Sequence, residues 1–347
     1  MTSNRTIDCK AKIIEALKKM DEFDCKLLIV LKNKLFDGLI SIGDIQRGII
    51  NNIPLENSIS IIQRKEIRIA KPNDNIRVIK KMMLDYRMEF CPVVNDKNEI
   101  VNIFYWEDLF PNQKVEVSNK FNIPVVLMAG GVGSRLRPLT YVLPKPLIPI
   151  GEKTIMQEIF DRFFNYGCNQ MFTSINYKAD FIKEFINKLN LPYKITFFEE
   201  DRPMGTAGSL QLLKNKINTT FFVHNCDILI DGDYSEMLEF HNNNKNEITI
   251  IAAIKHFSLA YGAIETGVNG ELLSISEKPE YTFKVNSGMY ILEPQLLNEI
   301  PENQFFHITD LINQVKKRNG KIGVFPVSEN SWKDIGNWDE YIRLIRK

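Results

Sequence analysis

A cluster of three glycines within four positions is the feature of the sequence best suited to chemistry. Gly130, Gly131 and Gly133 let backbone N–H groups turn toward an anion without obstruction from a Cβ atom. Arg135 adds a fork of donors that suits phosphate, and Lys145, stiffened by a proline on each side, can meet a second phosphate. The spacing matches neither G-x-x-x-x-G-K-[ST] nor G-x-G-x-x-G. We interpret the segment as a polyphosphate-binding loop; a flexible strand-to-helix turn is the alternative.

The glycine loop follows a continuous apolar run at residues 124–129, which is typical of a strand buried on both faces of a parallel sheet. More strands of this type are predicted at residues 171–175, 220–224 and 247–254. Helical stretches are predicted between and after them, at residues 154–166, 179–189 and 233–242. This alternation predicts an open α/β sheet with right-handed crossovers, whose ligands lie beyond the carboxyl ends of the strands. The site is therefore expected in the loops that follow the strands.

The first third of the chain contains an internal repeat, because residues 29–45 can be laid without gaps on residues 93–109. Each copy reads as a strand, a polar turn, a second strand and an acidic residue that opens a helix. Apolar residues at helical spacing predict a further helix before each copy, around residues 13–20 and 76–83. We expect the two copies to pack as a pseudo-symmetric α+β pair at residues 1–112, followed by a linker at 113–122.

Composition narrows the class of protein. A chain of 347 residues is long enough for two domains. With 44 basic and 43 acidic residues it has no overall field to hold nucleic acid or an anionic membrane. The five cysteines are scattered, with no C-x-x-C pair, which is typical of a reduced cytoplasm. No apolar run approaches the roughly 20 residues of a membrane-spanning helix, so we expect a soluble cytoplasmic protein.

The segment from Leu127 to Thr140, with Pro-Lys-Pro-Leu-Ile-Pro-Ile at residues 144–150, resembles the signature of the sugar-1-phosphate nucleotidyltransferases. The resemblance extends to the end of the chain. It implies a Rossmann-like catalytic domain with a mixed, mostly parallel sheet at residues 123–347. It also implies that an NTP and a sugar 1-phosphate react to give a nucleotide sugar and pyrophosphate, with Mg²⁺ bound.

The resemblance assigns a role to individual residues. The catalytic residues are expected to be Arg135, Lys145 and Lys278. The nucleotide is expected to contact Leu127, Ala129, Gly130, Gly131, Gly133, Ser134, Glu200, Gly205 and Thr206. The sugar is expected to contact Tyr261, Gly262, Glu277, Asn286 and Gly288. A sugar phosphate is already an anionic nucleophile, so no general base is expected and the four histidines have no assigned role.

Asp227 and Asp334 resemble the metal-binding carboxylates of the family. Asp227 follows an apolar strand, and Asp334 lies in the motif Trp-Lys-Asp-Ile-Gly at residues 332–336. Two carboxylates far apart in sequence can converge on one hard cation, whereas either alone would be read as a cap or turn residue. Cys226 precedes Asp227 where the family usually has glycine, a departure that bears on the local backbone geometry.

Glu200 indicates which base is bound. It lies in residues 199–210, which resemble the base-reading loop of the family, and thymidylyl and uridylyl relatives commonly have glutamine at its place. An ionised carboxylate only accepts hydrogen bonds, and guanine offers adjacent N1–H and N2–H₂ donors. The sequence therefore favours GTP. Glu199 takes the role if the alignment shifts by one residue, and UTP, CTP and dTTP are the alternative substrates.

The N-terminal repeat resembles a pair of CBS domains, which bind adenine nucleotides between their copies. The resemblance assigns Ser41, Asp44 and Asp108 to the ligand, while Tyr105 stands where a small hydroxyl residue is expected, so one site is expected to function. A purely dimerising or packing role is the alternative. Such pairs often associate face to face, and a homo-oligomer is expected.

The pairing of the two domains resembles the glucosamine-1-phosphate guanylyltransferases of legionaminic acid biosynthesis. It implies glucosamine 1-phosphate as the acceptor, with mannose 1-phosphate and heptose 1-phosphate as alternatives. A different class of function, a catalytically silent nucleotide-sugar sensor, is the remaining possibility. Such subunits tend to lose phosphate or metal residues, and none of those residues is lost here.

Overall fold

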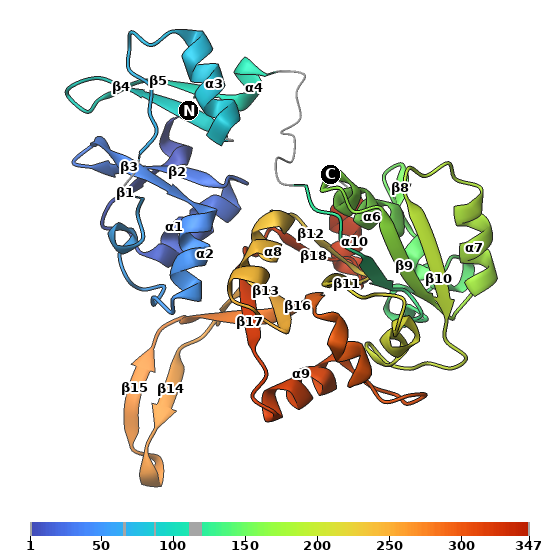
Figure 1. The fold of residues 1–347 in the computed structure, drawn as a ribbon. Coiled ribbons are helices and arrows are strands. Elements are labelled where there is room, and N and C mark those ends of the chain that lie inside the picture. Colours follow the sequence, from blue (N-terminus) through green and yellow to red (C-terminus); the bar gives the residue numbers. More distant parts are fainter. Residues whose placement is uncertain (1, 65–66, 87, 111–119, 346–347) are drawn as a thin grey trace. The chain divides into compact units, whose positions relative to one another are not determined.

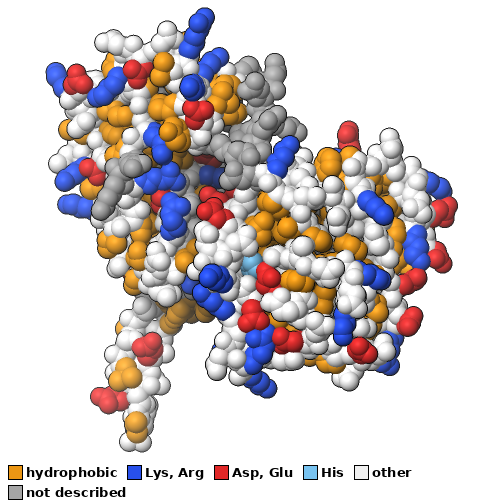
Figure 2. All heavy atoms as spheres, viewed as in Figure 1, with side chains coloured by type: hydrophobic (Ala, Val, Ile, Leu, Met, Phe, Trp, Pro, Cys, Tyr) orange, Lys and Arg blue, Asp and Glu red, His pale blue; other side chains and the backbone are white. Residues whose placement is uncertain are grey.

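The computed structural model describes the chain except for residues 1, 65–66, 87, 111–119 and 346–347. It contains two compact units, residues 1–116 and 117–347, each with its own core (Figure 1). Most of the predicted linker lies outside the described residues. In the part of the chain that the structure describes, no helix is long and apolar enough to cross a membrane. Acidic and basic side chains are mixed over the face drawn in Figure 2.

The N-terminal unit contains the two predicted copies. The first copy comprises β2 (Leu27–Lys32), β3 (Leu35–Ser41) and α2 (Ile42–Ile50), and the second comprises β4 (Phe90–Val94), β5 (Ile100–Tyr105) and the short α4 (Trp106–Leu109). The remaining elements are η1 (Thr2–Arg5), β1 (Thr6–Asp8), α1 (Ile13–Glu22), η2 (Ile59–Ile61) and α3 (Ile76–Tyr86). The helices predicted before each copy are α1 and α3, and both bury their apolar stripes.

The two copies share one core, as the repeat predicted. Ile29 and Phe36 of the first copy pack with Phe90 and Val94 of the second. The backbone N–H of Phe36 donates to the carbonyl of Asn98 at 2.8 Å and joins the two hairpins. Each hairpin thus buries an apolar face against the other.

The C-terminal unit is built on a seven-stranded sheet in the order β10-β9-β6-β11-β16-β13-β17. The strands are β6 (Val125–Met128), β9 (Gln170–Ile175), β10 (Lys194–Glu199), β11 (Phe221–Asn225), β13 (Ile248–Ser258), β16 (Glu280–Leu292) and β17 (Ile322–Val327). Strand β16 runs antiparallel to both of its neighbours, and the other pairs are parallel. The predicted mixed, mostly parallel sheet is therefore confirmed.

Helices connect the strands and cover the sheet (Figure 1). They are α5 (Leu139–Val142), α6 (Ile155–Asn165), α7 (Ala179–Asn187), α8 (Tyr234–Asn243), α9 (Ile308–Lys317) and α10 (Trp338–Ile345). Short 3-10 turns are η3 (Ser134–Leu136), η4 (Lys145–Leu147), η5 (Gly208–Leu213), η6 (Val268–Gly270) and η7 (Pro294–Asn298). The helical stretches predicted at residues 154–166, 179–189 and 233–242 correspond to α6, α7 and α8.

Three small sheets complete the unit. They pair β7 (Pro149–Ile150) with β8 (Lys153–Thr154), β12 (Ile228–Ile230) with β18 (Trp332–Asp334), and β14 (Ala263–Thr266) with β15 (Leu272–Ser276). Figure 1 shows the β14–β15 hairpin projecting from the ends of β13 and β16. The loops after β6, β10 and β11 lie at one edge of the sheet because these strands run parallel.

Candidate active site

The glycine loop begins where β6 ends, as the sequence predicted. Gly133 has a φ of +68° and lies close to Lys145, because a Cβ atom at Gly133 would be 3.1 Å from the Cβ atom of Lys145. The Thr140 hydroxyl donates to the carbonyl of Gly133 at 3.0 Å and closes the turn. At Gly131 a Cβ atom would meet nothing within 4 Å. The loop is thus folded onto Lys145 on one side and open on the other.

Lys145 lies at the centre of a charged cluster. Its side chain is 8% exposed, and its Nζ donates to Oδ2 of Asp227 at 2.7 Å. Arg135 Nη2 donates to the same oxygen at 3.1 Å, while Arg135 Nη1 is 4.0 Å from Oδ2 of Asp334. The structure therefore brings together two of the predicted catalytic residues and both predicted metal carboxylates.

Pairing of β12 with β18 draws the two carboxylates to one place. Ile228, the residue after Asp227, is opposite Asp334 in the antiparallel register. The N–H of Ile335 donates to the backbone carbonyl of Asp227 at 2.7 Å. Asp227 lies just beyond the end of β11. Because β18 pairs with β12, Asp334 is held at the same end of the sheet although it lies much later in the sequence.

Gly336 is a site residue that sequence reasoning missed. A Cβ atom there would lie 2.7 Å from Oδ1 of Asp334, 2.8 Å from Oδ2 of Asp227 and 3.0 Å from Nη2 of Arg135. Its N–H also donates to Oδ1 of Asp334 at 2.7 Å. Only glycine leaves the space between the carboxylates open. Its place at the end of the motif at residues 332–336 is the signal that could have identified it.

The paired carboxylates fit a hard divalent cation. Mg²⁺ is commonly held by one or two carboxylates together with substrate phosphates, not by a closed protein cage. Among the described residues, no group of three or more His, Cys, Asp or Glu side chains could hold a metal ion. The space that Gly336 leaves between Asp227 and Asp334 is lined by one oxygen of each carboxylate and by Nη2 of Arg135.

Cys226 accommodates the position that the family usually fills with glycine. Its φ is not in the left-handed region, so the backbone does not require glycine there. Its thiol is buried, and burial raises its pKa to about 12. Cys226 is therefore a neutral packing residue beside Asp227.

Glu200 lies against the glycine loop. It is 6% exposed, and a Cβ atom at Gly130 would be 2.9 Å from its Oε1. Oε1 accepts a hydrogen bond from the Ser174 hydroxyl, and Oε2 accepts one from the N–H of Met204 at 3.1 Å. Glu199 is instead exposed and pairs with Lys183 at 2.8 Å. Of the two glutamates, Glu200 is the one placed beside the loop.

The loop after Glu200 is held by the segment that leads into α9. Gly205 has a φ of +80°, and a Cβ atom there would be 2.6 Å from the carbonyl oxygen of Phe306. The Thr206 hydroxyl accepts from the N–H of Ile308 at 3.0 Å. Gly205 and Thr206 therefore fix the shape of the loop, and the prediction that they contact the nucleotide stays a prediction.

Asn286 and Gly288 lie on β16 next to the strand that carries Asp334. The indole N–H of Trp332 donates to the carbonyl of Ser287 at 3.0 Å and ties β18 to this segment. Asn286 Oδ1 accepts from the N–H of Gly288 at 3.1 Å, and its amide donates to the Tyr290 hydroxyl at 2.7 Å. The segment with two predicted sugar contacts is thus linked through Trp332 to β18, which carries the predicted metal carboxylate Asp334.

The remaining predicted sugar residues lie at the base of the β14–β15 hairpin. A Cβ atom at Gly262 would be 3.2 Å from Oε2 of Glu277. Tyr261 is exposed, and Lys278 is exposed with a φ of +45°. Among the hydrogen bonds and ion pairs of the described residues, none joins Lys278 to the cluster around Lys145. Its catalytic role stays a prediction.

Comparison with known proteins places this site in a family. Residues 124–347 match the family model described as nucleotidyl transferase. The chain belongs to the nucleotidyl transferase family. Residues 60–112 match the CBS domain model and include the second copy of the repeat.

Several curated relatives are guanylyltransferases. The chain is 30% identical over 232 residues to the probable mannose-1-phosphate guanylyltransferase 1 of Oryza sativa subsp. japonica, covering 64% of this chain and 63% of that protein. It is 27% identical over 226 residues to the mannose-1-phosphate guanylyltransferase of Mycobacterium tuberculosis, covering 64% and 63%. The chain thus spans less than two thirds of the length of these relatives.

Solved structures support the fold. HddC from Yersinia pseudotuberculosis superposes with a TM-score of 0.50 at 27% identity, covering 65% of this chain and 98% of that one. A putative glucose-1-phosphate thymidylyltransferase from Bacillus anthracis superposes with a TM-score of 0.51 at 21% identity, covering 65% and 94%. The second likeness concerns the fold alone.

Proposed function

We propose that this protein transfers a nucleoside monophosphate from an NTP to a sugar 1-phosphate and releases pyrophosphate. The observation that carries the proposal is the convergence of Lys145 and Arg135 on Asp227 and Asp334, beside a glycine loop at the carboxyl ends of parallel strands. The direct test is to incubate the chain with an NTP and a sugar 1-phosphate and to measure the release of pyrophosphate.

The geometry suits an in-line displacement at the α-phosphorus. An oxygen of the sugar phosphate forms the new P–O bond, and the bond to pyrophosphate breaks. Lys145 and Arg135 offset the charge that develops on the phosphate oxygens. One of the three N–H donors of Lys145 bonds to Asp227, so two remain for phosphate. The reaction needs no general base, and burial lowers the pKa of His224, next to this edge, to about 4.

Mg²⁺ is the proposed cofactor. Asp227 and Asp334 would hold it in the space that Gly336 leaves open, and it would neutralise charge on the reacting phosphates when bound.

We propose GTP as the nucleotide. The guanylyltransferase relatives support this choice, and so does the position of Glu200 against Gly130. Each oxygen of the Glu200 carboxylate accepts one protein hydrogen bond. A carboxylate has about four lone-pair sites, so acceptor capacity remains for the N1–H and N2–H₂ groups of guanine. UTP, CTP and dTTP are the alternatives.

Substituting Glu200→Gln is expected to lower the ratio of kcat/KM for GTP to that for UTP by about tenfold or more, because an amide replaces one acceptor by a donor. Steady-state kinetics with both nucleotides measure the ratio. Glu199→Gln is the matched control and should leave the ratio unchanged. An equal loss with GTP and UTP would show that Glu200 only shapes the loop, and would remove this argument for guanine.

Glucosamine 1-phosphate is the proposed acceptor. The pairing of a CBS unit with the transferase unit supports this choice. Mannose 1-phosphate is the alternative favoured by the names of the relatives, and heptose 1-phosphate is a third. The silent-sensor alternative is disfavoured because Arg135, Lys145, Asp227 and Asp334 are present and brought together.

The N-terminal unit is proposed to bind an adenine nucleotide that changes the transferase rate. Ser41 and Asp44 lie at the start of α2, and Asp108 is exposed on α4. Adding AMP or ATP to the transferase assay tests this regulation, and a packing or dimerising role is the alternative.

We propose that the protein works in the reduced cytoplasm and that it forms a homo-oligomer. The β14–β15 hairpin is the proposed contact between copies. Ile264 pairs with Ile275 across the hairpin, and Leu273 lies on the same face; each is more than 60% exposed. Glu265 and Ser274, hydrogen-bonded at 3.0 Å, lie on the other face. A two-stranded hairpin with an open apolar face is marginal in water. Two copies packed face to face would bury these faces and leave Glu265 in water.

Substituting Ile275→Asp is therefore expected to convert the oligomer to a species of half the mass or less, because it places a charge at the centre of the apolar face. Light scattering of the purified chain measures the mass. Glu265→Gln, on the polar face, should leave the mass unchanged. A monomeric wild-type chain, or an Ile275→Asp oligomer of unchanged mass, would contradict the proposal.

A further inference from the structure

Among the residues that the structure describes, both donors to the buried carboxylate of Glu200 are neutral groups. The Ser174 hydroxyl donates to Oε1, and the N–H of Met204 donates to Oε2 at 3.1 Å. A buried glutamate with a purely structural role is usually paired with lysine or arginine, because an uncompensated charge away from water is costly. The contacts of Glu200 therefore leave its charge available to a ligand that brings N–H donors.

Ser174 joins Glu200 to the start of the glycine loop. It lies near the end of β9 and is fully buried. Its backbone carbonyl accepts from the N–H of Ala129 at 3.1 Å, while its hydroxyl donates to Glu200. The N–H of Glu200 also donates to the carbonyl of Ile175, the next residue of β9, at 3.0 Å. The end of β9 thus holds both the backbone and the carboxylate of Glu200.

The two donors favour a carboxylate over an amide at position 200. A glutamine would offer one acceptor oxygen to two donors. The N–H of Met204 belongs to the backbone and cannot turn, so the amide oxygen would face it and the amide nitrogen would face Ser174. The Ser174 hydroxyl could accept from that nitrogen by turning its own hydrogen toward the Ser209 hydroxyl oxygen, 3.4 Å away. Ser174 therefore fixes how a side chain at position 200 turns its acceptors.

We propose that Ser174 is a positioning residue that orients the Glu200 carboxylate toward the base and so contributes to the preference for GTP. The N1–H and N2–H₂ groups of guanine are adjacent donors, so a carboxylate must present both oxygens in one plane to accept from both. Ser174 and Met204 hold one oxygen each and fix that plane before the nucleotide binds. A preorganised acceptor loses less entropy on binding. The inference rests on the proposed function and on the base-reading role of Glu200.

Substituting Ser174→Ala in the full chain is expected to lower the ratio of kcat/KM for GTP to that for UTP about fivefold, because the carboxylate loses one of its two fixed donors. The KM for GTP should rise while kcat stays nearly unchanged, since the hydroxyl acts on binding of the base and not on the reacting phosphates. Steady-state kinetics with both nucleotides measure these values. Ser174→Thr keeps the hydroxyl and should restore most of the ratio. An unchanged ratio in folded Ser174→Ala would overturn the proposal.

Thr173→Val is the matched control on the same strand. Thr173 is fully buried, its side chain points to the other face of the sheet, and its hydroxyl has no hydrogen-bond partner among the described residues. This variant should keep the wild-type ratio, and an equal loss in it would assign the effect to the strand and reject the proposal. Thermal unfolding monitors every variant. If Ser174→Ala does not fold, Ser174→Cys, which offers only a weak donor, should show the same loss of the ratio.

A double variant shows whether Ser174 acts through Glu200. In the Glu200→Gln background, Ser174→Ala should change the ratio by about twofold at most, because the carboxylate that it positions is absent. A second fivefold loss there would show that Ser174 acts by another route and would overturn the proposal. The wild-type chain separates this inference from the proposed function. Turnover without a preference for GTP would overturn the inference and keep the reaction, whereas no turnover with any nucleotide would contradict both.

Discussion

Substituting Lys145→Ala is expected to lower kcat/KM for pyrophosphate release on the order of 10³-fold. Lys145 is the least exposed cation of the cluster, and its Nζ is held 2.7 Å from Asp227. A buried ammonium acts on developing phosphate charge more strongly than an exposed one because water screens it less. Initial rates with the preferred NTP and sugar 1-phosphate measure the effect.

Two controls accompany this variant. Lys153→Ala removes a nearby lysine that pairs with Asp161 at 2.6 Å but lies outside the cluster, and its rate should stay near that of the wild type. Thermal unfolding should show a folded Lys145→Ala chain, since Arg135 still pairs with Asp227. A folded variant with at least a tenth of the wild-type kcat/KM would remove Lys145 from the catalytic residues.

Substituting Asp227→Asn is expected to lower kcat/KM by about 100-fold or more and to raise the Mg²⁺ concentration for half-maximal rate by about tenfold or more. Loss of an outer partner of a metal ligand already costs about 10–100-fold, so loss of a ligand should cost at least that. The substitution also removes the counter-charge of Lys145 and Arg135. Rates measured over a range of Mg²⁺ concentrations test both effects.

Asp231→Asn is the matched control, because Asp231 directly follows β12 and pairs with Arg162 at 3.9 Å. It should leave the Mg²⁺ dependence unchanged. If Asp227→Asn retained the wild-type rate and Mg²⁺ dependence, Asp227 would not be a metal ligand.

The sequence predicted those parts of the fold that local pattern encodes. The buried strand before the glycine loop and the helices α6 to α8 follow from the local sequence pattern. The two N-terminal copies follow from the gapless repeat of residues 29–45 and 93–109. The position of the glycine loop at a strand end follows from the same pattern. Periodicity carries no information on direction, so it did not predict that β16 runs antiparallel inside the sheet.

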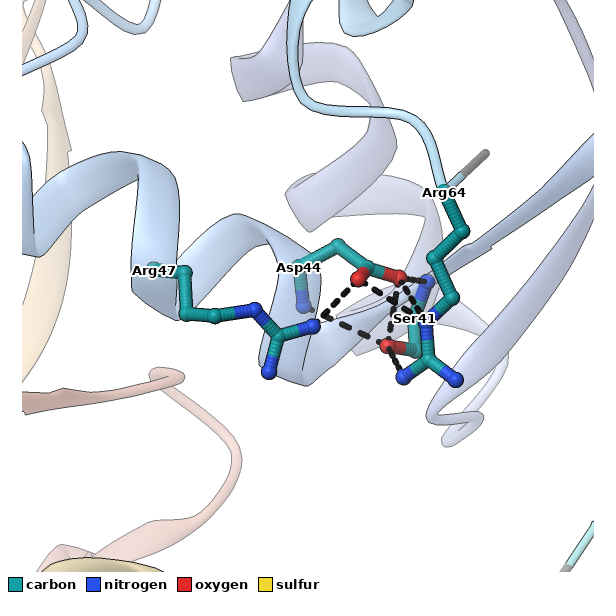
Figure 3. A network of polar contacts seen from close by, with 4 residues as sticks. All are labelled: Ser41, Asp44, Arg47 and Arg64. Atoms are coloured by element: carbon teal, nitrogen blue, oxygen red, sulfur yellow. Dashed lines mark hydrogen bonds and ion pairs between the residues drawn. The ribbon is translucent and has the colours of Figure 1, made fainter. Parts of the chain in front are cut away.

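Other parts of the site depend on contacts between distant segments. Strands β12 and β18 have three residues each, too few for a periodic signal, yet their pairing places Asp334 beside Asp227. The resemblance predicted the pair Asp227 and Asp334. That Gly336 leaves space between their carboxylates was visible only in the structure. Arg64 likewise pairs with Asp44 from 20 positions away, and no sequence motif predicted this contact (Figure 3).

Pyrophosphate release by the purified full chain with Mg²⁺ is the decisive test of the proposed transferase reaction. GTP is compared with UTP, CTP and dTTP, and glucosamine 1-phosphate with mannose 1-phosphate and glucose 1-phosphate. We expect turnover that prefers GTP and depends on the sugar 1-phosphate, with glucosamine 1-phosphate as the best acceptor. Turnover of another pair would keep the reaction and reject the proposed specificity. The absence of pyrophosphate release with every pair would contradict the proposed reaction and favour a nucleotide-sugar sensor.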